Sequence, residues 1–358
     1  MAYCQLNLLF WVYIFVAIIQ FGIFIAHGEP KVPCYFIFGD SLVDSGNNNK
    51  LITKAKANYP PYGIDFPQGV TGRFTNGRTI ADMIGELLDF DEYIPTFLVA
   101  TDTQISKGVN YGSAAAGIRD ETGSHLGGRI SFNRQLHNHN TTLSRLFHLQ
   151  RNTTFTNEHL SKCIYLVNIG SNDYINNYLM PTIYTTSHIH TPYRYATVLV
   201  RQYAQQLKTL YDLGGRKIVV FGLGPVGCTP TEISIFGTNG SPCVESINDA
   251  VRQFNNKLRP LIDELNHDNP NAKFTFINLT SISSLQEGSR LSNVPCCKLR
   301  VDGQCIRNRP VCPDRAMSEY YDGFHPTEIA NTLIASMSYT ALSPMDASPY
   351  DISELVKL

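Results

Sequence analysis

The stretch FIFGDSLVDSGNNN, from Phe36 to Asn49, joins a wholly apolar run to an abruptly polar one. The change falls at Gly39, Asp40 and Ser41, and these residue types commonly end a strand and begin a turn or a helix. The segment therefore either marks the end of a buried strand and nothing more, or places a reactive hydroxyl at that end. The rest of the chain has to distinguish these two interpretations.

Four further apolar runs resemble the first in length and in their β-branched or aromatic content, and they predict buried strands. The five predicted strands cover residues 34–38, 108–111, 163–169, 217–221 and 273–277. Helical periodicity fills the gaps, most clearly over residues 195–215. Because each parallel crossover needs a helix-sized connection, this alternation predicts a parallel five-stranded sheet with helices on both faces. No Pro-, Ser- or Gly-rich linker divides the chain, so we expect residues 29–358 to form a single α/β domain.

The surface of this domain is expected to be unusually poor in charge. Charged residues make up 16% of the 358-residue chain, below the roughly 25% usual for soluble domains. The formal net charge is -1, and no basic run with interleaved aromatic residues marks a nucleic-acid partner. Sugar could supply the missing polarity, and sequons that predict N-glycosylation begin at Asn140, Asn152, Asn239 and Asn278.

The N-terminus indicates export. An almost unbroken apolar run covers residues 8–26, and Ala26-His27-Gly28 is a small-x-small cleavage pattern followed by polar residues. A retained signal anchor is the alternative, because the leader has no Lys or Arg and the apolar run is long. We expect residues 1–28 to be a cleaved signal peptide. The mature chain would then be extracellular or in the cell wall and would keep no membrane span.

Cysteine content agrees with an oxidising compartment. Removing Cys4 with the leader leaves eight cysteines, an even number that suits disulfides. Four of them cluster late in the chain, where zinc is the alternative ligand. No C-x-x-C pair or matching His spacing supports zinc there, so disulfides in a stapled loop are favoured. The clustered residues are Cys296, Cys297, Cys305 and Cys312.

A serine becomes a nucleophile only when a base removes its proton and a third group orients that base. Ser41 follows a predicted parallel strand, at the edge where ligand-binding loops gather. His325 is the strongest candidate base, because Asp322 precedes it by three residues on a Gly-containing loop. D-x-x-H by itself also describes a plain turn, but together with Ser41 it predicts a Ser-His-Asp arrangement. Five other histidines lie in segments where solvation explains them, namely His137, His139, His148, His188 and His190.

Five ordered motifs are spread along the chain, and they read FGDSLVDSGNNN, TGRFTNGRTIAD, IGSNDYINNYL, VVFGLGPVGCTP and YYDGFHPTEIAN. Together they resemble the plant GDSL-type esterase/lipase family, a branch of the SGNH hydrolases. The resemblance extends over residues 35–331. It implies a three-layer α/β/α flavodoxin-like fold and ester hydrolysis without a metal or another cofactor.

The resemblance also implies roles for individual residues. Ser41 would be the nucleophile, His325 the base and Asp322 its orienting acid. The oxyanion would be held by the Ser41 backbone N–H, a backbone N–H of the second conserved block and the Asn172 side chain. For Asn172 the alternative is a helix N-cap or a turn residue.

The second block departs from the family pattern, which has a glycine where this chain has alanine. Ala115 is the preferred alignment for the oxyanion donor, and Ala114 is the alternative. Alanine keeps the backbone N–H, so the donor survives provided that the local backbone does not need a positive φ.

A flavodoxin-like strand order would make the first and third predicted strands neighbours. Cys34 and Cys163 open these strands, so they could form a disulfide, and two free buried thiols are the alternative.

The function implied is a secreted serine esterase or lipase that hydrolyses carboxylic esters of small molecules, lipids or acylated polymers through an acyl-enzyme on Ser41. Two alternatives remain open. One is acyl transfer to an alcohol acceptor by the same residues, and the other is a catalytically silent binding protein on the same fold.

Overall fold

The structure is a computed structural model that describes residues 29–284 and 291–358. The expected signal peptide at residues 1–28 therefore lies outside the described residues. Within the described ranges, no helix is both long and apolar enough to cross a membrane.

Four parallel strands and one short antiparallel strand form the central sheet of the described chain. They are β1 (Tyr35–Gly39), β2 (Ile164–Asn168), β3 (Lys217–Phe221), β4 (Lys273–Ile277) and β5 (Ala347–Ser348), and they lie side by side in that order. Every residue of β1 and β2 is buried, which is why these runs are apolar throughout instead of alternating with polar residues. The predicted α/β class is confirmed.

The predicted strand at residues 108–111 is the one element that differs. This segment lies against β1 and makes two backbone hydrogen bonds with Ile37, one through the Val109 carbonyl and one through the Tyr111 N–H, but only the Ile37–Asn110 pair forms a bridge. Gly108 has a φ of +131°, and a side chain on it would clash with the Tyr35 backbone, so the regular ladder is interrupted. The fifth strand is instead β5, which pairs antiparallel with β4. If the 108–111 segment is counted as a strand at the free edge of β1, the order of the parallel strands is the flavodoxin-like one.

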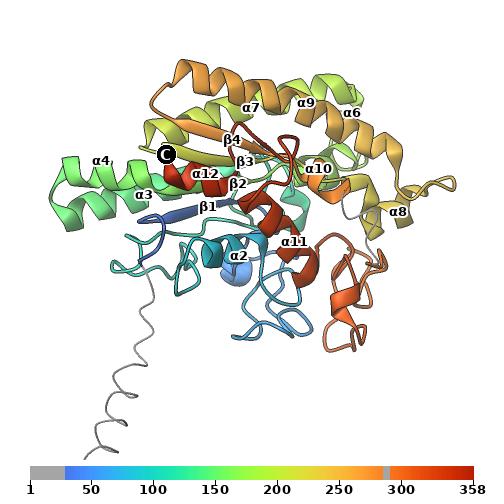
Figure 1. Cartoon of the computed structure of the whole chain (residues 1–358). Helices are drawn as coiled ribbons and strands as arrows, with labels where there is room; N and C mark the ends of the chain where they lie inside the picture. Colours follow the sequence, from blue (N-terminus) through green and yellow to red (C-terminus); the bar gives the residue numbers. More distant parts are fainter. Residues whose placement is uncertain (1–28, 285–290) are drawn as a thin grey trace, which may run out of the picture.

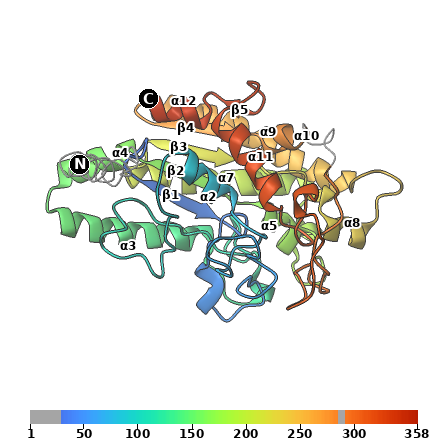
Figure 2. The same cartoon turned by 60° about the horizontal axis from the view of Figure 1, so that its bottom comes forward.

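Helices cover both faces of the sheet, because alternate strand residues point to opposite sides. Phe36, Tyr165 and Val220 pack against one helical layer, whereas Ile37, Leu166 and Val219 pack against the other. Figures 1 and 2 show the two layers. The first contains α3 (Phe132–Gln150), α4 (Thr153–Lys162), α7 (Pro192–Asp212) and α9 (Glu245–Asp268), and the second contains α2 (Ile80–Leu87), α11 (Glu328–Tyr339) and α12 (Ile352–Lys357).

Short helices follow the carboxyl ends of the strands. They are α5 (Ser171–Asp173), α6 (Thr186–Ile189), α8 (Pro230–Phe236) and α10 (Leu279–Ser284). Figure 2 shows α5 and α8 at one end of the sheet, together with the loop that leads into α11. Because ligands of open α/β sheets bind at the carboxyl ends of the strands, we expect the ligand-binding site at this end.

His139 corrects one sequence-based interpretation, because it is not solvated. It is fully buried on the inner face of α3, with its Nδ1 3.1 Å from the Tyr111 hydroxyl. Burial lowers the pKa of His139 to about 3, so the ring is neutral. Its neighbours in the core are the rings of Phe36, Phe38, Tyr111 and Tyr165.

The predicted glycosylation sites differ in accessibility. Asn140, Asn152 and Asn239 are exposed. Asn278 is half-buried, and its side-chain amide donates to the Met345 carbonyl at 3.0 Å. Glycosylation stays a prediction, and it is best supported at the three exposed positions.

Candidate active site

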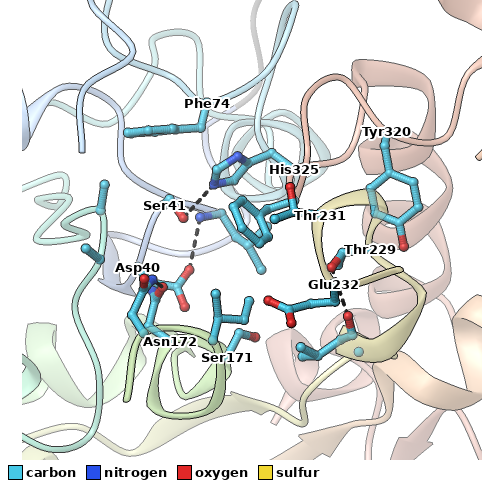
Figure 3. A pocket seen from close by; sticks show the side chains of 18 of the residues that line it. Asp40, Ser41, Phe74, Ser171, Asn172, Thr229, Thr231, Glu232, Tyr320 and His325 are labelled. Atoms are coloured by element: carbon cyan, nitrogen blue, oxygen red, sulfur yellow. Dashed lines mark hydrogen bonds between the residues drawn. The ribbon is translucent and has the colours of Figure 1, made fainter. Parts of the chain in front are cut away.

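A cavity of about 420 Å³ lies at the carboxyl ends of the parallel strands (Figure 3). Its walls come from the turn after β1, the helix α5 after β2, the segment that follows β3, and the loop before α11. Apolar side chains dominate the lining, and among the described residues neither Lys nor Arg contributes to it. The cavity therefore suits a neutral, largely apolar ligand.

Ser41 enters this cavity from a tight turn that closes β1. The Asp40 carbonyl accepts the backbone N–H groups of Val43 and Asp44, and Asp40 Oδ1 accepts that of Leu42 at 3.0 Å. A side chain at Gly39 would clash with the Asn168 carbonyl on β2, so only glycine lets the chain turn so close to the sheet. Of the two structures that these residue types commonly begin, a turn or a helix, residues 41–43 form a turn.

Three predicted residues meet at this turn. His325 Nε2 lies 2.7 Å from Ser41 Oγ, and His325 Nδ1 lies 2.8 Å from both carboxylate oxygens of Asp322. Ser41 and His325 are 284 positions apart in sequence. A base within hydrogen-bonding distance of the hydroxyl, oriented in turn by a carboxylate, can accept the serine proton and stabilise the resulting imidazolium.

Asp322 is held from several directions. It is fully buried, and its Oδ1 accepts the backbone N–H groups of Phe324 and His325, each at 2.9 Å. Its Oδ2 accepts the hydroxyl of Tyr62 at 2.6 Å. A side chain at Gly323 would clash with Thr231 Oγ1 and the Gly303 backbone, so the Asp-x-x-His loop needs glycine at its centre. The short spacing that suggested a turn is therefore also the geometry that orients the carboxylate.

Tyr62 and Phe74 are site residues that sequence reasoning missed. Burial raises the pKa of the Tyr62 hydroxyl well above its usual range, so it stays protonated and donates to Asp322. The same hydroxyl accepts the Cys305 backbone N–H at 3.1 Å. The Phe74 ring packs on the imidazole of His325, with their centroids 4.9 Å apart. Phe74 lies within the TGRFTNGRTIAD motif, whereas no local pattern singles out Tyr62.

Asn172 lies in α5, beside the cavity, and its side chain does not cap the helix. The N-cap is Gly170, with no side-chain hydrogen bond, so the capping alternative is wrong. Asn172 Nδ2 donates to the Ala116 carbonyl at 3.0 Å, and its Oδ1 accepts Asn176 Nδ2 at 2.6 Å. These two bonds fix which end of the amide is nitrogen. They also leave the second Nδ2 hydrogen without a partner among the described residues.

The structure distinguishes the two candidate donors of the second block. The Ala114 N–H is engaged, because it donates to Asp44 Oδ2 at 3.0 Å. Neither the Ala115 N–H nor the Ser41 N–H makes a hydrogen bond within the described ranges. Both nitrogens are therefore available to a ligand, which favours Ala115 over Ala114.

We expected the Ala115 donor to survive only if the local backbone did not need a positive φ. The φ of Ala115 is nevertheless +65°. This left-handed conformation is the one that glycine adopts freely, and it costs an alanine about 1 to 2 kcal/mol. The surrounding loop holds it there, since Asp44 binds the Ala114 N–H and Asn48 donates to the Ala114 carbonyl at 3.1 Å. Alanine thus keeps the donor at the expense of local strain.

Two more buried carboxyl groups line the cavity, and neither was singled out by the sequence. Burial raises the pKa of Asp40 to about 7 and that of Glu232 to about 7. Asp40 Oδ2 and Glu232 Oε2 have no hydrogen-bond partner in the described part of the chain. Asp40 lies at the start of the Ser41 turn, whereas Glu232 points from α8 into the cavity (Figure 3).

Cysteines elsewhere in the described chain form four disulfides, as predicted from their number. Cys34 and Cys163 are paired, with their Cα atoms 4.7 Å apart, so the disulfide that would join the starts of β1 and β2 is present. The others are Cys228–Cys243, Cys296–Cys312 and Cys297–Cys305. The last two staple the loop before α11, in agreement with the disulfide interpretation of that cluster.

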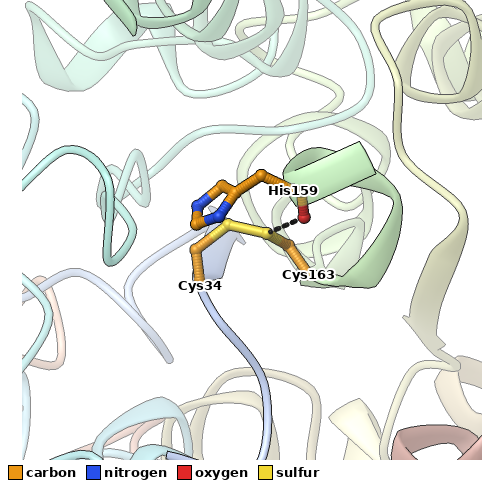
Figure 4. A group of neighbouring side chains, drawn as sticks. All are labelled: Cys34, His159 and Cys163. Atoms are coloured by element: carbon orange, nitrogen blue, oxygen red, sulfur yellow. Dashed lines mark hydrogen bonds between the residues drawn. A yellow bond between two sulfur atoms is a disulfide. The ribbon is translucent and has the colours of Figure 1, made fainter. Parts of the chain in front are cut away.

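His159 lies beside the Cys34–Cys163 disulfide, and these three residues are grouped closely enough to suggest a metal site (Figure 4). A cysteine binds a metal as its thiolate, and both sulfurs are here joined to each other. His159 Nε2 is also engaged, 2.9 Å from the Ser106 carbonyl. The group is therefore a disulfide with a neighbouring histidine.

Comparisons with known proteins agree with the geometry. A family profile described as GDSL-like Lipase/Acylhydrolase matches residues 35–337. The chain is 48% identical to the GDSL esterase/lipase At1g29670 of Arabidopsis thaliana in an alignment 347 residues long, which covers 94% of this chain and 95% of the relative. It is 47% identical to At4g18970 of the same plant, over 93% of this chain and 95% of that one.

A solved structure is also similar over much of the chain. The extracellular lipase of Streptomyces rimosus aligns with 85% of this chain and 99% of its own, at 14% identity and a TM-score of 0.32.

Proposed function

The chain belongs to the GDSL-like lipase/acylhydrolase family and is a carboxylic ester hydrolase, and on that premise we propose that it acts through an acyl-enzyme on Ser41. The observation that carries the proposal is the 2.7 Å separation of Ser41 Oγ and His325 Nε2, with Asp322 on the other side of the imidazole. A hydroxyl so placed is activated by its neighbour, without a metal ion or a cofactor in the step.

The mechanism proceeds in two acyl-transfer steps. His325 Nε2 accepts the Ser41 proton as Oγ attacks the ester carbonyl, and Asp322 holds the imidazolium that forms. The tetrahedral intermediate collapses, the C–O bond to the alcohol breaks, and the alcohol leaves with the proton from His325. Water then attacks the acyl-Ser41 ester with His325 as the base. The carboxylic acid is released, and His325 returns the proton to Ser41 Oγ.

Three donors would hold the negative charge that develops on the carbonyl oxygen. They are the backbone N–H of Ser41, the backbone N–H of Ala115 and the Asn172 amide. The first two make no other hydrogen bond in the described chain, and Asn172 has one amide hydrogen to spare. Donors that are fixed in place before reaction need no reorganisation during it.

The substrate class follows from the cavity. Its apolar lining, without Lys or Arg among the described residues, favours a neutral ester with an apolar acyl or alcohol chain. Small-molecule and lipid esters fit this description. The ester-linked acyl groups of a polymer also fit it if one acyl group at a time enters the cavity.

A fluorophosphonate probe tests the activated serine directly. We expect the wild-type protein to be labelled at Ser41 and Ser41→Ala to remain unlabelled at the same melting temperature. A folded wild-type protein that resists labelling would sink the mechanism. Product analysis with p-nitrophenyl esters and acetylated glycans, with and without added alcohol, then separates hydrolysis from transfer, because a transferase forms the new ester in preference to the free acid.

We further propose that the enzyme is exported as a single domain of residues 29–358 after removal of residues 1–28. The motivation is the apolar run at residues 8–26 and the cleavage pattern that follows it. N-terminal sequencing of the protein recovered from the medium should begin near Glu29. Recovery of the leader peptide in a membrane fraction, still attached, would contradict the proposal.

A further inference from the structure

Glu232 is a buried carboxyl that the proposed mechanism does not use. Only 3% of the residue is exposed, and it lies in α8, on the wall of the active-site cavity. Figure 3 shows its carboxyl group pointing into the cavity that also holds Ser41 and His325. Its Oε2 has no hydrogen-bond partner within the described residues.

The fold around α8 gives Glu232 no structural task. The helix starts with Pro230, and Thr231 ties it to the catalytic loop by donating its backbone N–H to the Gly323 carbonyl at 3.0 Å. None of the hydrogen bonds or ion pairs found in the described chain involves the Glu232 side chain. A buried polar group that the protein leaves unsatisfied is destabilising, and such groups in native structures call for an explanation.

The chemical state of this carboxyl narrows the choice of ligand. Burial raises the pKa of Glu232 to about 7, and no Lys or Arg of the described chain lines the cavity to offset a negative charge. The other acidic residues on the lining are Asp40, Asp302 and Glu319, and the histidines are His125 and His325. Below neutral pH, Glu232 is therefore a neutral acid, with one hydrogen-bond donor and one free acceptor.

A hydroxyl group has the same pair of functions, so it can bind both ends of a neutral carboxyl group. On the wall near α8, Val226, Ile235 and Phe236 suit an alkyl chain, and Thr229 and Thr231 also line the cavity there. A cationic ligand would instead need the ionised carboxylate, which burial disfavours.

We propose that Glu232 is a specificity residue that binds a hydroxyl group carried on the alkyl chain of the ester substrate. This inference rests on the proposed ester hydrolysis at Ser41. It makes the preferred substrates hydroxyalkanoate esters, whose alkyl chain would lie on the apolar part of the lining while the hydroxyl group binds Glu232.

The kinetic test compares p-nitrophenyl octanoate with p-nitrophenyl esters of 3-hydroxyoctanoic and 8-hydroxyoctanoic acids at about pH 6. In the wild type, at least one hydroxylated ester should have the higher kcat/KM. Glu232→Leu should lower the ratio of hydroxylated to plain ester about tenfold, because the hydroxyl loses its partner in an apolar site. Glu232→Gln keeps a neutral donor and acceptor and should retain most of that ratio. Glu245→Gln, an exposed carboxyl at the start of α9, is the matched control.

Two outcomes overturn the proposal. One is a ratio that changes less than twofold in Glu232→Leu for both hydroxylated esters. The other is an equal loss in Glu232→Gln and Glu232→Leu accompanied by a loss of activity on acetylcholine, because this pattern would mean that the charge binds a cation.

Equilibrium binding separates this inference from the hydrolase proposal. Ser41→Ala cannot turn an ester over, so methyl octanoate and methyl 8-hydroxyoctanoate can be titrated into it intact, together with methyl 3-hydroxyoctanoate. A hydroxylated ester should bind Ser41→Ala more tightly than the plain one, and the preference should vanish in the Ser41→Ala, Glu232→Leu double variant. Such a preference would support the subsite even if the wild type failed to hydrolyse any ester. Equal binding of the plain and hydroxylated esters to Ser41→Ala would overturn the subsite even if hydrolysis proceeded.

Discussion

Asp322 and Glu232 are both buried carboxyl groups at the end of the sheet where the cavity lies, yet they differ in the hydrogen-bond donors around them. Asp322 receives hydrogen bonds from two backbone N–H groups, from the imidazole of His325 and from the Tyr62 hydroxyl. Glu232 Oε2 receives none within the described chain. The comparison teaches that donors decide what a buried carboxyl can do. With its bonding capacity filled it orients a neighbour, and with that capacity unused it is available to a ligand.

Removing the charge of Asp322 should have the largest effect. Asp322→Asn replaces one acceptor oxygen with an amide nitrogen, so the imidazole is no longer held with its proton on Nδ1. We expect kcat to fall about 10⁴-fold, the size seen when the acid of a Ser-His-Asp triad is replaced in this way. Asp102→Asn, which changes an exposed carboxylate paired with Arg145, is the control and should leave kcat unchanged. A loss of less than tenfold in Asp322→Asn would mean that this well-bonded carboxyl only shapes the loop.

Asn172, like Asp322, is held by hydrogen bonds, and it lines the cavity. Asn172→Ala removes a proposed oxyanion donor. We expect kcat to fall about 10² to 10³-fold with little change in KM, because the interaction forms mainly in the transition state. The lost bond to the Ala116 carbonyl should lower stability by only about 0.5 to 1.5 kcal/mol. Kinetics and melting temperature should be measured on one preparation. Normal kcat with a lowered melting temperature would assign Asn172 to the scaffold alone.

Glu232→Gln tests the other side of the comparison through pH. The pKa of Glu232 is about 7 in the folded protein against an ordinary value of 4.5, so the folded state holds the proton more strongly than the unfolded state. Wild-type stability should therefore fall by about 3 kcal/mol from this group as pH rises from about 4.5 to 7, and this contribution should change little at higher pH. The Gln variant lacks this ionisation.

The readout is the difference in free energy of unfolding between wild type and Glu232→Gln. In urea denaturation at about pH 4.5 and pH 8, the free energy of unfolding of the variant relative to that of the wild type should be higher at pH 8. Subtracting the two proteins removes the contributions of other titrating groups, including Asp40. A difference that is the same at both pH values would show that Glu232 is not held neutral by burial.

Tyr62→Phe should have the smallest effect and sharpens the account of Asp322. The variant removes one of the four donors, and we expect kcat to fall about tenfold, equivalent to about 1.4 kcal/mol. Tyr59→Phe is a matched control, because Tyr59 donates its hydroxyl to the Cys305 carbonyl at 2.9 Å and is not among the donors to Asp322. Both variants should lose similar stability. Equal kcat values for the two would show that Tyr62 supports only the disulfide-stapled loop.

Much of the architecture was readable from local sequence patterns. Buried parallel strands are apolar throughout and helices repeat every 3.6 residues, so four strands and the helix α7 were predicted close to their bounds. Ser41 stood out because a polar turn follows an apolar strand, and Asp322 and His325 because they are three residues apart. These signals are local, since one short segment contains the whole pattern.

The tertiary structure decided what depends on contacts between distant segments. Tyr62 reaches Asp322 across 260 positions, and no periodicity or spacing encodes that meeting. The same holds for His139, whose polar sequence neighbours concealed a buried ring, and for the positive φ of Ala115, which the loop around it imposes.

Glu232 shows the limit most clearly. In sequence it is an ordinary acidic residue in the first turn of a short helix, where such residues are favoured. Only the packing of α8 against the catalytic loop buries it and aims it into the cavity. Sequence determined which residue types stand at the ends of the strands, whereas the folded chain determined which of their polar atoms are satisfied, because hydrogen-bond partners and burial depend on segments hundreds of residues apart.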